Sequence, residues 1–191
     1  MKYVLITGSS GLVGSEAVNF FIKKKFKIIT VDNNLRKYFF GKNADTNWQK
    51  KNQIKKFKNE IIHNSVDIRN YRKMTDIFFK YKKKIRCIIH AAAQPSHDWA
   101  YKEPILDFDV NAKATLHLLE CTKKFCPKAT FIYVSTNKVY GDTPNKLKIK
   151  EKKTRFEIVD KRYKKGINEN LSIDKSTHSL FGVSKCSADL L

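Results

Sequence analysis

Residues 7–14, TGSSGLVG, join a short apolar run to a segment with helical spacing. The preceding residues 2–7, KYVLIT, are typical of a buried strand, and the apolar positions of the following GLVGSEAVNFFIKKK recur at helical intervals. Gly8, Gly11 and Gly14 are spaced GxxGxxG between them. Glycine is needed where the backbone turns tightly or comes close to a pyrophosphate, and the positive end of a helix attracts such an anion. The sequence therefore predicts a strand, a phosphate-binding turn and a helix, in that order.

The rest of the chain continues this alternation of short apolar strands and amphipathic helices. Further strands are predicted at 27–32, 60–68, 86–93 and 129–136, and helices at 47–58, 70–82 and 105–125. Parallel strands that alternate with helices form a sheet covered on both faces. We therefore expect an α/β fold, a Rossmann-like doubly wound parallel sheet of five strands with flanking helices. Residues 1–191 are expected to form one domain.

The segment 141–176 interrupts the alternation, because it is polar and charged and has no clear period. A loop of this length in a compact domain is usually functional or disordered. We expect it to be a long loop near the substrate site, and we expect a helix to begin within residues 176–191, STHSLFGVSKCSADLL. The last three residues offer neither a glycine cap nor a basic side chain, which favours a chain that continues beyond them.

The composition is strongly basic, with 39 Lys and Arg residues against 18 Asp and Glu residues, a formal net charge of +21 and a pI near 9.8. Clustered basic residues bind phosphate backbones, but only six of the 39 are Arg, and KKK at 23–25 and 82–84 falls where helices are expected to end. Lysines at such positions complement the helix dipole and stay solvated. We therefore predict no nucleic-acid partner, whereas anionic small substrates remain compatible with the charge.

Several classes of protein and site are excluded by what the sequence lacks. It has no run of eighteen apolar residues, and no apolar core of a signal peptide follows Met1. These features predict a soluble, cytoplasmic protein with no membrane partner. The four cysteines, which form no CxxC pair and no His/Cys spacing suited to zinc, are Cys87, Cys121, Cys126 and Cys186. We expect reduced thiols and no metal site.

The ends of three predicted strands carry residues suited to a dinucleotide. Asp32 closes the second strand, eighteen residues beyond Gly14. A carboxylate there accepts from both ribose hydroxyls of an adenosine and repels a 2′-phosphate, which favours NAD over NADP. Asp67 follows the third strand, where it either meets the adenine amino group or caps the next helix. HAAAQ, residues 90–94, closes the fourth strand, and its small side chains leave room for a flat dinucleotide.

Together with Asn111, STNKVYGD at 135–142 and Lys185, these motifs resemble those of the extended short-chain dehydrogenases that act on sugar nucleotides. The resemblance extends over residues 1–191, and it implies that they form an NAD-binding domain that is incomplete, with the C-terminal substrate region absent. More narrowly, STNKVYGDTPN, SIDKSTHSLFGVSK and AAAQPSHDW resemble the CDP-paratose 2-epimerase branch, whose members invert a hydroxyl at C2 of a CDP-linked dideoxyhexose. The resemblance implies an isomerase that oxidises its sugar transiently, with NAD accepting and then returning the same hydride.

The motifs and the resemblance together predict a set of cofactor-binding residues. They are Gly8, Ser10, Gly11, Leu12, Val13, Gly14, Asp32, Asn33, Asp67, Ile68, Ala91, Ala92, Ala93, Asn111 and Lys185. By motif position, the resemblance implies that Thr136 hydrogen-bonds the reacting sugar oxygen. It also implies that Lys185 binds the nicotinamide ribose and favours hydride transfer. It suggests a homodimer formed through the helices near 105–125 and 177–191.

The active-site tyrosine that the resemblance implies falls at position 181, which is Phe181. Loss of a proton-transferring hydroxyl lowers a rate by about 10² to 10⁴ when nothing replaces it. Candidate replacements are His178, His97 and Tyr140, and each also has a structural interpretation. His178 is alternatively a cap of the helix that follows, His97 a substrate-phosphate contact or an exposed side chain, and Tyr140 a packing residue.

Three functions are compatible with these residues. The first is an NAD-dependent sugar-nucleotide epimerase that acts on a CDP-sugar. The second is a 4-epimerase or 4,6-dehydratase of the same family, although TNK provides Asn137 and Lys138 where a dehydratase needs an acid and a base. The third is a catalytically silent protein that keeps NAD binding, which Phe181 and the missing C-terminal region favour.

Overall fold

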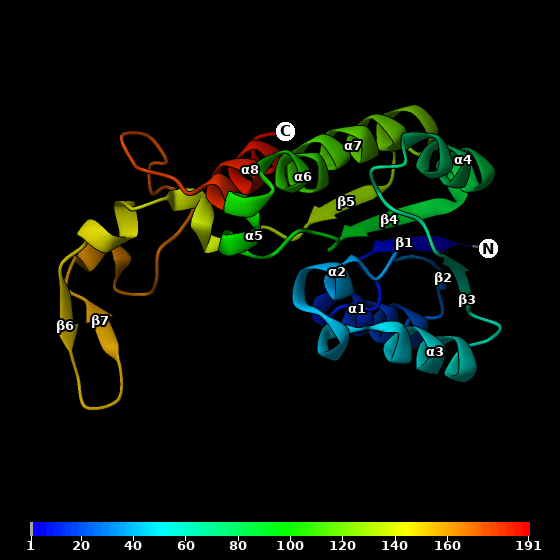
Figure 1. The fold of residues 1–191 in the computed structure, drawn as a ribbon, viewed down its shortest axis with the longest axis horizontal. Helices are drawn as coiled ribbons and strands as arrows, with labels where there is room; N and C mark the ends of the chain where they lie inside the picture. Colours follow the sequence, from blue (N-terminus) through cyan, green and yellow to red (C-terminus); the bar gives the residue numbers. More distant parts are fainter. Residues whose placement is uncertain (1) are drawn as a thin grey trace.

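A five-stranded parallel sheet forms the centre of the protein (Figure 1). The computed structural model describes residues 2–191. The strand order is β3-β2-β1-β4-β5, and the strands are β1 (Tyr3–Thr7), β2 (Lys27–Val31), β3 (Ile61–Asn64), β4 (Ile85–His90) and β5 (Thr130–Tyr133). Leu5 in the central strand pairs with Ile29 on one side and with Ile88 on the other. The expected fold class, a doubly wound parallel sheet of five strands, is confirmed.

Helices cover both faces of the sheet (Figure 1). They are α1 (Leu12–Lys23), α2 (Leu35–Phe40), α3 (Asn47–Lys56), α4 (Tyr71–Tyr81), α5 (His97–Lys102), α6 (Pro104–Phe108), α7 (Ala114–Phe125) and α8 (Leu180–Asp189). Helices α1 and α3 lie on one face, and α4, α7 and α8 lie on the other. The central strand is therefore shielded from solvent at every residue from Val4 to Thr7.

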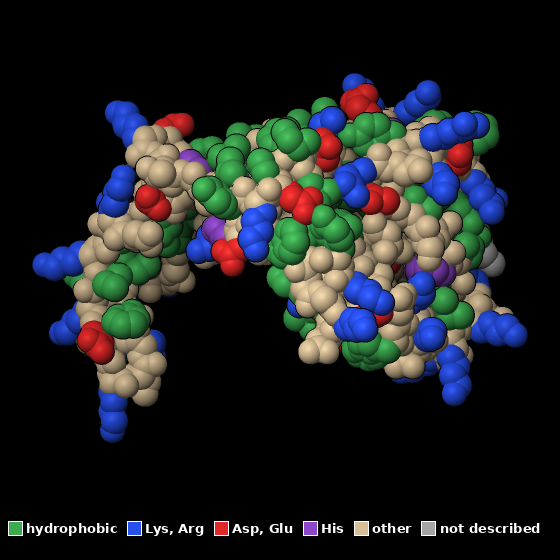
Figure 2. Space-filling model, in the orientation of Figure 1, with side chains coloured by type: hydrophobic (Ala, Val, Ile, Leu, Met, Phe, Trp, Pro, Cys, Tyr) green, Lys and Arg blue, Asp and Glu red, His purple; other side chains and the backbone are tan. Residues whose placement is uncertain are grey.

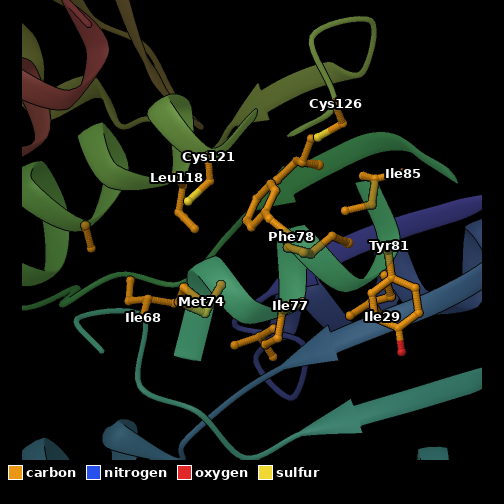
Figure 3. Close-up of a cluster of buried hydrophobic side chains, with 14 of the residues drawn as sticks. Ile29, Ile68, Met74, Ile77, Phe78, Tyr81, Ile85, Leu118, Cys121 and Cys126 are labelled. Atoms are coloured by element: carbon orange, nitrogen blue, oxygen red, sulfur yellow. The ribbon is translucent and has the colours of Figure 1, made fainter. Parts of the chain in front are cut away.

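The larger hydrophobic core lies between the sheet and helices α4 and α7 (Figure 3). Met74, Ile77, Phe78 and Tyr81 recur at intervals of three and four residues, so they form one apolar face of α4. That face packs against Leu118 of α7, which is fully buried. A smaller cluster from β1, β2, β4 and α1 lies on the opposite face of the sheet.

The structure divides some of the predicted helices and adds others. The helix predicted at 105–125 consists of α6 and α7, joined by a π-helical turn at Asp109–Lys113. Neither α2 nor α5 was predicted, because each has six residues and is too short to display a helical period. Both short helices follow strand ends and therefore lie near the edge of the sheet where a ligand site is expected.

The polar segment 141–176 contains an antiparallel hairpin of β6 (Ile149–Glu151) and β7 (Phe156–Ile158). It is therefore not a loop throughout. In Figure 1 the hairpin projects away from the sheet and its covering helices. Each of its strands has three residues, and β6 is exposed along its whole length. The placement of this segment near a substrate stays a prediction.

Lys and Arg side chains project over the whole face seen in Figure 2, with Asp and Glu side chains among them. The positive charge of that face is thus spread out instead of gathered in one patch. No helix within residues 2–191 has the length and apolar character that a membrane crossing requires. Over the same residues, no three His, Cys, Asp or Glu side chains gather as ligands of a metal ion.

Candidate functional site

The turn between β1 and α1 is folded so tightly that side chains at two of its positions would collide with backbone atoms. Gly8 has a φ of +64°, and a Cβ there would lie 2.7 Å from the backbone nitrogen of Ala92. A Cβ at Gly14 would lie 2.1 Å from the Gly8 carbonyl oxygen. Both positions therefore require glycine. Because these glycines allow close contacts, α1 begins near the ends of β1 and β4.

The N-terminus of α1 is open to a ligand. Gly11 precedes the helix, and no side chain caps it. The first helical residues, Leu12 and Val13, are 86% and 50% exposed although both are apolar. Because the first backbone N–H groups of a helix have no partner within the helix, this end can bind an anion.

A pocket of about 230 Å³ lies beside this turn, at the carboxyl ends of β1, β2 and β4. Twelve of the fifteen predicted cofactor-binding residues line it, whereas Ser10, Asn111 and Lys185 do not. Eight lining residues were not predicted: Val31, Leu35, Arg36, Thr46, Val66, Pro95, Val110 and Val134. Six of these eight residues are apolar, and all but Pro95 lie outside the sequence motifs.

The Asp32 carboxylate directly follows β2 and is fixed by two backbone groups. Ser10 N–H donates to its Oδ2 at 2.8 Å, and Asn34 N–H donates to its Oδ1 at 2.8 Å. Asn34 has a φ of +59°, a left-handed conformation that Asn tolerates. Each carboxylate oxygen keeps a second acceptor position, because an ionised carboxylate accepts about four hydrogen bonds. Asp32 therefore lies at the pocket wall and can accept further hydrogen bonds from a ligand.

Asp67 also lines the pocket, but its neighbours already engage it. Arg69 Nη2 donates to Oδ2 at 2.7 Å, and Asn33 Nδ2 donates to the same oxygen at 2.9 Å. Burial raises the pKa of the Asp67 carboxyl, but the hydrogen bonds and charge of Arg69 outweigh burial and hold that pKa below its usual value. The alternative that Asp67 caps the next helix is wrong, because Asn70 caps α4 by accepting from Lys73 N–H.

A chain of hydrogen bonds through His90 supports the floor of the pocket. Thr115 Oγ1 donates to the Asn111 carbonyl at 2.6 Å, so it accepts from His90 Nε2 at 2.9 Å. Burial lowers the pKa of His90 to about 3, so the ring is neutral and its Nδ1 accepts from Thr7 Oγ1 at 2.7 Å. Thr7 Oγ1 in turn accepts from Ala92 N–H at 3.2 Å. These partners lie as far as 85 residues apart in the chain, so no local pattern indicated them.

Asn111 lies in the π-helical turn, and its amide group is used inside the protein. Its Oδ1 accepts from Gln94 N–H at 2.9 Å, and its Nδ2 lies 3.0 Å from Asp107 Oδ1 and 3.1 Å from Ser184 Oγ. Asp107 is 1% exposed, and burial raises the pKa of its carboxyl. These contacts join α6, the π turn, α8 and the loop after β4. A contact between Asn111 and a cofactor stays a prediction.

Lys185 is buried against the end of β5. Its Nζ donates to the Val134 carbonyl at 2.8 Å and lies 4.2 Å from the centre of the Tyr133 ring. Burial lowers the pKa of its ammonium group to about 8, although the charges of Asp189 and Asp107 oppose this shift. At neutral pH the site therefore contains a buried positive charge, close to the last strand of the sheet.

Helix α8 packs on the turn that follows Thr136, and Gly182 allows this close contact because it has no side chain. A Cβ at Gly182 would lie 2.9 Å from the Lys138 carbonyl oxygen. Thr136 precedes the 3₁₀ turn at Asn137–Tyr140, and both contacts of its hydroxyl are long, at 3.4 Å. The hydroxyl is therefore available to another partner. The helix that carries Lys185 thus contacts the turn that follows Thr136.

Phe181 is 7% exposed and packs against His97. Their ring centres are 5.0 Å apart, with an angle of 57° between the ring planes. His97 is the first residue of α5, and Ser96 caps that helix by accepting from Trp99 N–H at 3.3 Å. The His97 side chain is exposed. The fold thus brings together two of the residues that the sequence singled out.

His178 and Tyr140 already form hydrogen bonds with other residues. His178 Nε2 donates to the Ile173 carbonyl at 3.0 Å, and its Nδ1 is buried without a partner among the described residues. The alternative that His178 caps the helix is wrong, because Ser179 caps α8. The Tyr140 hydroxyl donates to the Asn168 carbonyl at 3.2 Å.

Comparison with curated proteins finds relatives that act on sugar nucleotides by name. The chain is 34% identical to CDP-paratose 2-epimerase of Salmonella typhi, over 97% of this chain and 50% of that protein. It is 30% identical to UDP-glucuronate 4-epimerase of Thermodesulfobacterium geofontis, over 75% of this chain and 42% of that protein. The chain thus spans about half the length of these relatives.

Solved structures share the fold at lower identity. The UDP-Glc/GlcNAc 4-epimerase of Campylobacter jejuni matches with a TM-score of 0.73 and 18% identity, over 100% of this chain and 47% of that one. The dTDP-glucose 4,6-dehydratase of Bacillus anthracis, solved in complex with NAD, matches with a TM-score of 0.67 and 22% identity, over 100% of this chain and 49% of that one.

The family model described as GDP-mannose 4,6 dehydratase matches residues 5–157, which include both the glycine turn and Thr136. This match and the named relatives confirm the resemblance to the extended short-chain dehydrogenases that act on sugar nucleotides. Since the matched residues make up most of the chain, the protein belongs to the GDP-mannose 4,6 dehydratase family.

Proposed function

We propose that the protein is an NAD-dependent sugar-nucleotide epimerase that inverts a hydroxyl at C2 of a CDP-linked sugar by transient oxidation and re-reduction. The observation that carries this proposal is the pocket at the carboxyl ends of β1, β2 and β4, where the glycine turn and Asp32 lie together. The relative named CDP-paratose 2-epimerase, at 34% identity, supports the substrate class. A cytoplasmic location and a homodimer through α6, α7 and α8 belong to the same proposal.

The residues of the pocket fit a dinucleotide. The uncapped start of α1 suits the pyrophosphate, and the exposed apolar side chains of Leu12 and Val13 would be covered by the bound molecule. The free acceptor positions of Asp32 suit two ribose hydroxyls, and its negative charge repels a 2′-phosphate. The small side chains of Ala91 and Ala92 leave space over the end of β4. These features support NAD.

Arg36 makes NADP the competitor that a binding test must include. It lines the pocket, and its guanidinium lies 5.1 Å from the centre of the Phe40 ring. A guanidinium near the ribose is the group that accommodates a 2′-phosphate in NADP-binding proteins. Asp32 directly follows β2, and two backbone N–H groups hold its carboxylate in place. We therefore expect the negative charge of Asp32 to decide the preference for NAD over NADP.

The protein's own residues bind and orient the sugar. Bound NAD would supply the acceptor, and later the donor, of a hydride at the sugar carbon. Thr136 offers a hydroxyl with only long contacts, which can hold the reacting sugar oxygen. Lys185 places a positive charge beside the end of β5. There it would contact the nicotinamide ribose of bound NAD and favour transfer of the hydride from the sugar.

A catalytically silent NAD-binding protein is the second candidate function. Phe181 favours it, because phenylalanine has no proton to exchange. A 4-epimerase or a 4,6-dehydratase is the alternative within the enzyme class, since relatives with those names also match. Asn137 and Lys138 follow Thr136 in place of an acid and a base, which disfavours the dehydratase.

Calorimetric titration of the protein with NAD and with NADP tests dinucleotide binding, which both candidate functions require. We expect NAD to bind more tightly than NADP. Asp32→Asn should weaken NAD binding by about tenfold or more, because hydrogen bonds to a charged group are worth about 1.5–3 kcal/mol. Arg36→Gln is the matched control, since it should weaken NADP binding more than NAD binding.

Incubation of the complete gene product with CDP-paratose and detection of the C2 epimer by NMR tests the reaction. Formation of the epimer supports the epimerase. Tight NAD binding without turnover of CDP-paratose or of UDP- and dTDP-hexoses supports the silent protein instead. Absence of binding to either dinucleotide contradicts both candidate functions.

A further inference from the structure

An epimerase that works by oxidation moves a proton as well as a hydride. The alcohol loses its hydroxyl proton as the hydride leaves its carbon, and it regains a proton when the hydride returns. Position 181 lies one helical turn before Lys185 in α8, and its phenylalanine has no proton to exchange. Another group that reaches the same space must therefore accept and return the proton.

Three hydroxyl or imidazole groups around α8 are either buried or already hydrogen-bonded. The Tyr133 hydroxyl is buried without a hydrogen-bond partner among residues 2–191, and burial raises its pKa above the usual value. The Tyr140 hydroxyl donates to the Asn168 carbonyl. His178 donates through Nε2 to the Ile173 carbonyl, and its Nδ1 is shielded from solvent. None of the three therefore offers an atom that is both accessible and free of a hydrogen bond.

His97 differs from these groups in both accessibility and position. Its side chain is exposed, and its ring forms no hydrogen bond with any residue that the structure describes. Its ring centre lies 5.0 Å from that of Phe181. Helices α5 and α8 pack against each other, so this contact is set by the fold. The imidazole of His97 is therefore in contact with the ring at the position where the resemblance implies a tyrosine.

Charged residues lie on α5 itself and on α6 and α8, the two helices that pack against it. Asp98 follows His97 on α5, Asp107 lies on α6, and Lys185 lies on α8. Asp107 and His97 interact electrostatically, so a positive charge formed on the imidazole has a carboxyl group within range.

We infer that His97 is the proton-transfer residue of this site, in place of the hydroxyl that Phe181 lacks. The inference rests on the proposed function, since it concerns the proton of the same sugar alcohol. The neutral imidazole accepts the O–H proton while the C–H electron pair and hydrogen leave as hydride to the nicotinamide dinucleotide, and a C=O bond forms. In the return step the imidazolium gives back the proton as the hydride returns, so atoms and electrons balance.

Four variants of the complete gene product test this inference. His97→Gln keeps a side chain of similar size without a basic nitrogen. His178→Gln makes the same change at the histidine whose Nδ1 is buried and whose Nε2 is hydrogen-bonded. We expect His97→Gln to lower kcat on CDP-paratose by about 10² to 10⁴. NAD affinity should be unchanged, since His97 does not line the pocket. His178→Gln should keep the wild-type kcat.

Rescue by a tyrosine separates proton transfer from a structural role of His97. Phe181→Tyr places a hydroxyl on the ring that His97 contacts. In the double variant with His97→Gln, this hydroxyl should restore a large part of the lost kcat. Packing alone cannot explain such a rescue, because phenylalanine and tyrosine have the same ring and differ only in the hydroxyl.

Chemical modification gives a readout that does not depend on turnover. Diethyl pyrocarbonate should modify His97, and mass spectrometry of the peptide that contains it measures the rate. NAD together with CDP-paratose should slow that modification. An unchanged rate with both molecules bound overturns the assignment of His97.

The outcomes distinguish this inference from the proposed function. If wild-type protein epimerises CDP-paratose and His97→Gln does so at a similar rate, the assignment of His97 is wrong and the proposed function stands. If wild-type protein turns over no sugar nucleotide, the proposed function is wrong and the inference falls with it.

Discussion

The ammonium nitrogen of Lys185 lies 4.2 Å from the centre of the Tyr133 ring, inside the protein. Lys185 is 3% exposed, so the face of the ring and the Val134 carbonyl replace the water that an exposed lysine has. These contacts stabilise the charged ammonium group less than water does, because burial lowers its pKa to about 8. The charge at this position is thus sensitive to pH in a range where an exposed lysine is not.

We expect Lys185 to make the protein more stable as the pH rises from 8 to 10.5. Its pKa is about 8 in the folded protein and 10.5 in the unfolded chain, so between these values the unfolded chain binds more protons and the free energy of unfolding increases. Lys185→Met removes this contribution, which amounts to roughly 3 kcal/mol across the range. Urea denaturation of both proteins at several pH values measures it. Parallel pH dependences would contradict the buried ammonium group.

We expect His90 to make the protein less stable as the pH falls below 6.5. Its pKa is about 3 in the folded protein against 6.5 for a free imidazole, so in this range only the unfolded chain takes up the proton. The free energy of unfolding should fall by roughly 2 kcal/mol between pH 6.5 and pH 4.5 from this residue.

His90→Gln is the variant that isolates this effect. A glutamine amide can accept from Thr7 and donate to Thr115 as the ring does, but it does not titrate. Denaturation curves at the two pH values should therefore differ less for the variant than for the wild type. An equal decrease in both proteins would show that other groups cause the acid sensitivity.

Gly14→Ala should abolish dinucleotide binding. The added Cβ would lie 2.1 Å from the Gly8 carbonyl oxygen, so α1 must shift relative to the turn. Overpacking of this kind costs about 1–3 kcal/mol or more. Gly11→Ala is the control, because its Cβ would lie 3.3 Å from the same oxygen. Calorimetry with NAD and thermal unfolding compare the two, and equal NAD binding by both would contradict the steric argument.

Gly182→Ala should destabilise the protein although alanine is the better helix former. In an exposed helix the change gains about 1 kcal/mol. Here the added Cβ would lie 2.9 Å from the Lys138 carbonyl oxygen and would push α8 away from the turn after Thr136. Chemical denaturation of Gly182→Ala beside Val183→Ala, which alters an exposed position of the same helix, measures the effect. A more stable Gly182→Ala protein would refute the close packing.

The features that depend on neighbouring residues were predicted from the sequence. All five strands of the parallel sheet were predicted, because each is a short apolar run between helices. Gly8 and Gly14 were identified since tight turns restrict residue types locally. The end of the third strand was placed too late, because the strand ends at Asn64. The side-chain amide of Asn64 donates a hydrogen bond to the Thr30 carbonyl in the neighbouring strand.

The contacts between distant residues were not predicted. The ring contact of His97 with Phe181 and the hydrogen bond of Lys185 to Val134 depend on which side of α8 faces the sheet. A helical period fixes which residues share a face but not what that face meets. For the same reason, the bonds of Asn111 within the protein carried no signal in its own segment.

The hydrogen bonds through His90 all run in one direction, from Ala92 N–H to the Asn111 carbonyl. Reversal would leave an amide hydrogen facing a hydroxyl hydrogen at one end and a carbonyl without a donor at the other. The imidazole is therefore locked in a single tautomer and cannot relay protons. The core behind the pocket therefore offers no path for a proton through His90, whereas the side chain of His97 is exposed to solvent.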